Sequence, residues 1–129
     1  MVDCLNKSIY TLNVDGMGTT IIIGKGLDNF NGGHKVLLAH FIKVIKAALA
    51  MSVDTEKPVS DVHIYLKDCS FKNFPATIVR KVVKGLQKTF QNTLNKCYIH
   101  NLSGMGRNLW NCFKFLADTD TRKKILLVD

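Results

Sequence analysis

The sequence lacks any apolar run long enough to cross a membrane. Its first residues, Met-Val-Asp-Cys-Leu-Asn-Lys, have neither the basic start nor the apolar stretch of a signal peptide, so we expect none. No internal repeat, low-complexity tract or linker divides the 129 residues. We therefore expect a single domain over residues 1–129, in a cytoplasmic protein that contacts membranes only at their surface.

Cysteine is also sparse. The cysteines are widely spaced at Cys4, Cys69, Cys97 and Cys112. They form neither a CxxC pair nor the dense framework that cross-links small secreted folds. The spacing predicts free thiols in a reducing compartment.

A nucleotide-binding loop is absent despite a glycine-rich stretch. Five residues separate Gly18 from Gly24, which is too many for a P-loop, and Gly26 offers no hydroxyl group to a magnesium ion. The stretch is better explained as a strand that ends in a glycine turn.

Catalytic and metal-binding patterns are missing too. The histidines have neither HExxH nor zinc-finger spacing, and no Ser-His-Asp order or nucleophile elbow occurs. His63 and His100 lie on two expected strands and are placed to meet, with hydrogen-bonded or surface histidines as the simpler role. We expect no metal, no cofactor and no enzymatic activity; only a deep pocket around His63, Tyr65 and His100 would favour an enzyme.

The residues that are present indicate an ordinary globular core. Hydrophobic residues make up 47% and charged residues 22%, which separates the chain from disordered and collagenous classes. Alternating β-forming residues predict strands at 8–14 and 59–67, and short runs of β-forming or apolar residues predict strands at 19–23, 97–100 and 125–128. Apolar residues at helical spacing predict helices at 35–51, 75–93 and 108–117.

The resulting order is β-β-α-β-α-β-α-β. The turn-like residues from Asp15 to Gly18 join the first two strands as a hairpin. Strands that alternate with helices favour parallel pairing with right-handed crossovers. The sequence therefore predicts an α/β fold with a mixed, mainly parallel five-stranded sheet.

The last expected helix, 108–117, carries more apolar surface than one face can hold. It presents Leu109, Trp110, Phe113 and Leu116 together with other apolar residues. Its second face must be covered by the core, by a bound ligand or by a second copy of the protein.

Positive charge points to an anionic partner. The net charge of +8 favours a nucleic acid, an anionic membrane or an acidic protein. The basic residues form two clusters. The first is a ridge with one-turn spacing, formed by Arg80, Lys84 and Lys88. The second is a run before the last strand, formed by Arg122, Lys123 and Lys124. A solvated helix face would look the same. Nucleic acid is disfavoured because no reading helix or interleaved aromatics accompany the charges.

Several segments together carry a resemblance to a known family. They are Thr20-Ile21-Ile22-Ile23-Gly24, His40 to Ile45, Val62 to Leu66, and the run from Leu94 through Trp110 to Ile125. The chain resembles CRAL-TRIO lipid-binding domains, in the divergent branch found in Rho GTPase-activating proteins and BCH scaffold proteins. Asn101 stands where that branch usually has proline.

The resemblance implies a CRAL-TRIO-like minimal core. It makes helix 108–117 a lid over an apolar cavity, with the sheet as the floor, and assigns ligand contact to Leu109, Trp110, Phe113 and Leu116. It also implies lipid binding or transfer, with the basic clusters meeting an anionic headgroup such as a phosphoinositide. The alternative is a scaffold without lipid that binds a small GTPase or forms a homodimer.

Overall fold

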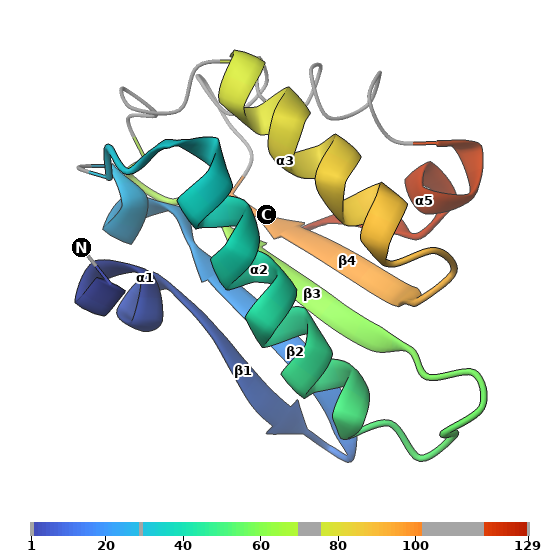
Figure 1. The fold of residues 1–129 in the computed structure, drawn as a ribbon. Helices are drawn as coiled ribbons and strands as arrows, with labels where there is room; N and C mark the ends of the chain where they lie inside the picture. The colour runs from blue at the N-terminus through green and yellow to red at the C-terminus, as the bar shows by residue number, and fades with distance from the viewer. Residues whose placement is uncertain (1, 29, 70–75, 102–117, 129) are drawn as a thin grey trace.

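The strands of the protein form one twisted sheet, with two long helices on one of its faces. The computed structural model describes residues 2–28, 30–69, 76–101 and 118–128 (Figure 1). The strands are β1 (Ile9–Val14), β2 (Met17–Ile23), β3 (Ser60–Tyr65), β4 (Leu94–His100) and β5 (Ile125–Val128). The helices are α1 (Val2–Ser8), η1 (Gly24–Leu27), α2 (Gly33–Ala50), α3 (Ala76–Thr89) and α5 (Thr119–Lys123).

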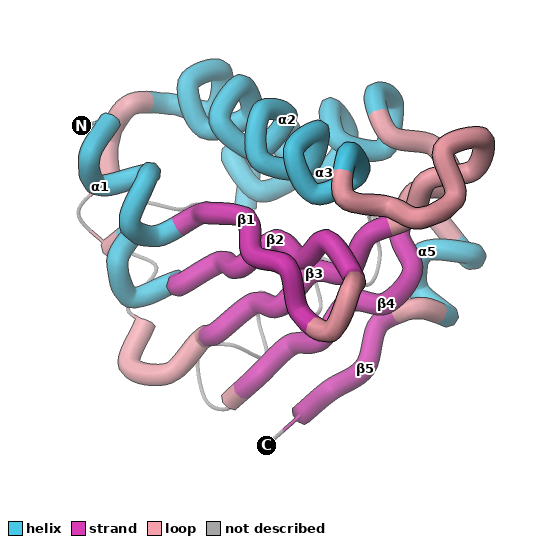
Figure 2. The backbone as a smooth tube through the Cα atoms, turned by 90° about the horizontal axis from the view of Figure 1, so that it is seen from below, coloured by secondary structure: helices cyan, strands magenta, loops and turns pink. Residues whose placement is uncertain are grey.

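The sheet confirms the predicted fold class. Its five strands lie in the order β1-β2-β3-β4-β5, with β1 antiparallel to β2 and every later pair parallel. Parallel neighbours need crossover connections, and right-handed crossovers in one direction bring their helices to one face. Figure 2 shows α2 and α3 on the same side of the strands.

Helix α2 packs directly on the first two strands. Its buried residues Leu37, Phe41, Val44 and Ala48 recur at helical spacing and face the sheet. The Thr11 hydroxyl on β1 donates to the Val44 carbonyl at 2.7 Å. Gly18 on β2 lies so close to Ala48 that a Cβ atom there would overlap the Ala48 carbonyl. Glycine thus permits the close approach of α2 to β2.

Helix α3 instead packs against α2. Gly85 faces the Leu38 side chain, which would collide with any Cβ at that position. Val82 and its neighbours Ile78 and Leu86 join the α2 residues in the larger core cluster. Among the described residues, α3 makes few close backbone approaches to the strands. The helix is therefore held away from the sheet.

The structure adds short elements that the sequence pattern did not predict. Residues 2–8 form α1, the expected loop after β2 contains η1, and the basic turn before β5 is the helix α5. Asp118 caps α5 by accepting from the Thr121 N–H at 2.7 Å, and this hydrogen bond holds the Asp118 pKa below its usual range. Short helices of this kind lack enough apolar repeats to show a period.

The largest boundary differences lie between α3 and β4. Helix α3 ends at Thr89 rather than at residue 93. Asn92 adopts a positive φ of 60° in the turn that follows, which a continuing helix does not allow. Strand β4 correspondingly begins earlier, at Leu94.

Candidate functional site: an apolar cavity under α3

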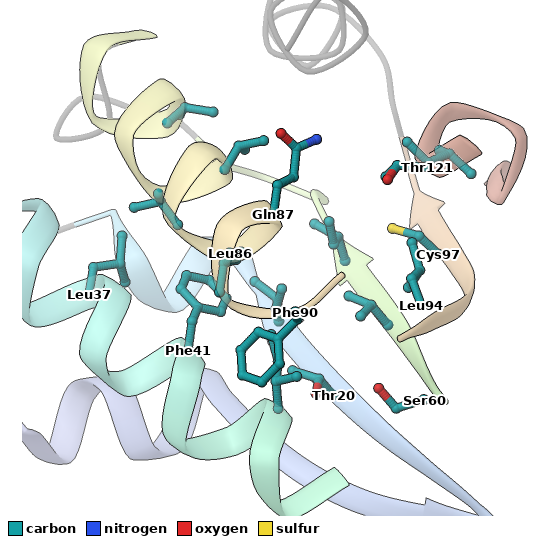
Figure 3. A pocket seen from close by; sticks show the side chains of 18 of the residues that line it. Thr20, Leu37, Phe41, Ser60, Leu86, Gln87, Phe90, Leu94, Cys97 and Thr121 are labelled. Carbon is teal, nitrogen blue, oxygen red and sulfur yellow. The ribbon is translucent and has the colours of Figure 1, made fainter. Parts of the chain in front are cut away.

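A cavity of about 240 Å³ lies between α3 and the sheet (Figure 3). Its lining comes from β2, β3 and β4, from α2 and α3, and from the α5 to β5 segment. The described lining residues are mostly aliphatic or aromatic, and none of them is charged. A concave site with apolar walls and few polar groups is typical of a small-molecule or lipid pocket.

The floor is set by strand alternation. Val62, Ile64 and Leu66 point to the helix side of β3, as the sequence pattern predicted. Cys97 of β4 pairs with Val62 and also faces the cavity. Burial raises the pKa of the Cys97 thiol to about 12, so Cys97 serves here as a small apolar side chain.

The opposite wall belongs to α3 and the turn that follows. Val79, Val83 and Gln87 lie one turn apart and form one row along the helix. Phe90 and Thr93 extend the wall toward β4. The apolar stripe on residues 75–93 was predicted from the sequence, but its division between a packed side and a cavity side was not.

Two polar atoms in the lining have no hydrogen-bond partner among the described residues. They are the Thr20 Oγ1 on the floor and the Gln87 Nε2 on the α3 wall. Figure 3 shows them on opposite sides of the cavity. Buried polar groups are almost always paired, so each marks a place where another molecule can bind.

The basic clusters lie on elements that border this cavity. Arg80, Lys84 and Lys88 are exposed on α3. Arg122 and Lys123 are exposed on α5, and Lys124 is half-buried. Both α3 and the α5 segment contribute lining residues, so the two predicted clusters flank one cavity. Within the described ranges, none of these six residues forms an ion pair.

The predicted lid helix falls outside the described residues. Leu109, Trp110, Phe113 and Leu116, assigned to ligand contact from the sequence, all lie in that segment. Their role in ligand contact stays a prediction. The cavity described above is lined by other residues. The sequence had not named the side chains of β3, β4 and α3 as ligand contacts. Two sequence features could have identified these side chains as ligand contacts. They are the alternation along the strands and a glutamine at the edge of the apolar stripe of α3.

The face of the sheet opposite α2 and α3 carries a separate cluster of rings. His63 and Tyr65 on β3 lie beside Tyr98 and His100 on β4, with near-parallel ring planes. The Nδ1 atom of His63 is 2.9 Å from the Nε2 atom of His100, so the two histidines do meet. The described cavity lining includes none of the four rings, because they lie on the opposite face.

The described residues hold neither a metal site nor a membrane-spanning helix. In the part of the chain that the structure describes, no three His, Cys, Asp or Glu side chains come together as a metal site. No described helix combines the length and the apolar character needed to span a bilayer.

The sequence of elements, the sheet order and the cavity can now be compared with known proteins. The model of the CRAL/TRIO domain family matches residues 6–129, which is nearly the whole chain. The chain belongs to the CRAL/TRIO domain family. The resemblance inferred from the quoted segments is thereby confirmed at the level of the family.

Solved structures share the fold of this CRAL/TRIO domain. The chain is similar to the protein in "Crystal structure of Sfh5", with a TM-score of 0.80 and 16% identity over 99% of this chain. At this identity the likeness shows the fold. The chain spans 50% of the length of that protein. A search of curated proteins finds no significant match.

Proposed function

We propose that this CRAL/TRIO domain binds a lipid, with the apolar part of the ligand in the cavity between α3 and the sheet. The observation that carries the proposal is the uncharged, mainly apolar lining of a cavity of about 240 Å³. Each methylene group moved there from water contributes roughly 0.8 kcal/mol to binding. The family supports the same assignment, since the sequence resemblance already implied lipid binding.

The headgroup is proposed to lie at the rim, near the basic clusters. Lys84 and Lys88 on α3, and Arg122 and Lys123 on α5, flank the cavity with exposed cations. Each cation near an anionic surface contributes about 1 kcal/mol. An anionic headgroup such as a phosphoinositide is therefore favoured, and lipid transfer at a cytoplasmic membrane surface is the activity that follows. No bond-making step is needed.

The cavity is tested by filling it. In the Val62→Phe variant, a phenyl ring would occupy the floor and compete with the ligand. We expect at least a tenfold loss of lipid uptake, measured by native mass spectrometry after incubation with phosphatidylinositol vesicles. Leu126→Phe is the matched control, because Leu126 is 40% exposed and its β4 partner Tyr98 lies on the sheet face opposite α2 and α3.

Two results would reject the lipid proposal. The first is a wild-type protein that takes up no lipid from any vesicle. The second is equal uptake by the Val62→Phe and Leu126→Phe variants when both melt cooperatively, since binding would then occur elsewhere.

Headgroup recognition is tested by charge reversal. Lys84→Glu and Lys88→Glu should each weaken sedimentation with anionic vesicles by roughly fivefold or more. Lys57→Glu makes the same charge change in the exposed turn before β3 and should have a smaller effect. Equal losses in all three variants would indicate a net-charge effect instead of a rim site.

A second candidate function is protein interaction, with the chain in the scaffold branch of Rho GTPase-activating and BCH proteins. Its support is the sheet face opposite α2 and α3, where Leu12 and Val14 at one edge and Leu126 at the other edge are each at least 40% exposed. Exposed apolar patches commonly mark contacts. Self-association or small-GTPase binding that is lost in Leu126→Lys, in a protein that takes up no lipid, would favour this function.

A further inference from the structure

Gln87 is out of place in the cavity wall. It continues the α3 row of Val79 and Val83, yet it ends in an amide whose Nε2 is buried and unpaired among the described residues. Figure 3 shows this amide projecting from α3 on the side of Thr121 rather than on the side of Leu37. A leucine would fill the same place without a polar group.

An unpaired buried amide costs free energy in the empty protein. The Nε2 atom is shielded from solvent and has no acceptor among the residues that the structure describes. Most lining residues near this wall, such as Val83 and Leu94, have apolar side chains, and neither Thr93 nor Thr121 forms a hydrogen bond with the Gln87 Nε2. An acceptor supplied by the bound molecule would offset the cost.

We infer that the ligand of this cavity carries a neutral hydrogen-bond acceptor, such as an ester, ketone or amide carbonyl, which receives the Gln87 N–H. This inference rests on the proposed function, because it requires the cavity to be the ligand site. The acceptor is neutral because the described lining holds no Lys, Arg or His to pair with a carboxylate. A pure hydrocarbon and a free fatty acid with its carboxylate inside are both disfavoured.

This acceptor is separate from the headgroup proposed for the rim. The exposed lysines of α3 point to solvent, whereas the Nε2 of Gln87 is buried in the wall. A lipid that satisfies both has a charged end outside and a carbonyl group at the start of its chain. The Gln87 side chain thus selects for the linkage between headgroup and chain.

The inference is tested with two ring probes of matched size, ethylbenzene and acetophenone, which differ by a carbonyl oxygen. Dissociation constants for both are measured by NMR titration of the full chain. In Gln87→Leu, the acetophenone constant should rise roughly three- to tenfold relative to wild type, the loss expected for one neutral hydrogen bond. The ethylbenzene constant should stay the same or fall, because the variant removes an unpaired amide.

The controls separate this inference from the proposed function. Gln91→Leu changes an exposed glutamine in the turn after α3 and should leave both constants unchanged. Thermal unfolding of each variant verifies the fold.

Each outcome decides between the two ideas. Binding of ethylbenzene with an unchanged acetophenone-to-ethylbenzene ratio in Gln87→Leu would overturn the inference and leave the cavity as the lipid site. Failure of both probes to bind the wild-type protein would overturn the cavity as a ligand site, and the inference with it. A selective loss of acetophenone binding in Gln87→Leu, absent in Gln91→Leu, supports it.

Discussion

The imidazole rings of His63 and His100 share a hydrogen bond of 2.9 Å between Nδ1 and Nε2, across adjacent parallel strands. One ring must donate and the other must accept, so the pair cannot keep this bond when both rings are protonated. Tyr98 and Tyr65 stack against the pair at centroid distances of 4.5 and 4.3 Å. The bond therefore ties β3 to β4 only while at least one ring is neutral.

Acid should weaken the fold through His63. Desolvation and the charge of His100 hold the His63 pKa below its ordinary value of 6.5, against an opposing effect of Asp61. The unfolded chain then binds more protons than the folded one, so stability falls as pH drops below about 6.5. Urea unfolding between pH 8 and pH 5 should show a steeper loss for wild type than for His63→Gln. Parallel profiles would contradict this assignment.

The thiols of Cys69 and Cys97 should react slowly in the native protein. Burial raises the pKa to about 12 for Cys97 and about 11 for Cys69, so little thiolate exists near neutral pH. Peptide mapping after brief iodoacetamide treatment at neutral pH should find both largely unlabelled, and fully labelled once the protein is denatured. Fast native labelling of Cys97 would show that the cavity wall opens to solvent.

Removing the Thr11 hydroxyl should loosen the contact between β1 and α2. Thr11→Val keeps the shape but deletes the bond to the Val44 carbonyl, which should cost about 1 kcal/mol of unfolding free energy. Thr89→Val deletes an exposed hydroxyl that donates to Gly85 within α3, and should cost less. Chemical denaturation of both variants measures the difference; equal effects would mean that the long-range bond adds nothing.

Adding a methyl group at Gly18 should be far more harmful. In Gly18→Ala the new Cβ would overlap the Ala48 carbonyl, a backbone atom that cannot rotate away. We expect a loss of about 3 kcal/mol or more of unfolding free energy, at the upper end of overpacking effects. Val14→Ala, at an exposed position of the same hairpin, is the control and should stay near wild type. Thermal melting of the two variants is the measurement.

The parts of the fold predicted from sequence are those with long periodic patterns. The apolar spacing of Leu37, Phe41 and Val44 gave α2 to within a few residues, and the alternation at Val62 and Ile64 gave both β3 and the side that faces the cavity. Short segments such as α1 and α5 carry too few repeats for a period to appear, and α5 depends on a single capping contact at Asp118.

The cavity was harder to predict than the helices and strands, because it depends on the separation between α3 and the sheet. Arg80, Lys84 and Lys88 were placed on the exposed side of α3 from spacing alone. The cavity itself arises because α3 packs on α2 through Gly85 and Leu38, a tertiary contact with no local signature. His63 and His100 were foreseen as neighbours because both lie on strands, but their bond depends on strand register.

The β3 to β4 ladder contains an irregularity with a mechanical result. Between Ser60 and Val62 the register shifts, so that Asp61 faces two residues of β4 and accepts hydrogen bonds from the Asn95 side chain and the Lys96 N–H. These hydrogen bonds hold β3 and β4 together, whereas α3 packs mainly against α2. Under the proposed function, ligands of different thickness would be accommodated by a tilt of α3 over the sheet, without the loss of a β-ladder hydrogen bond.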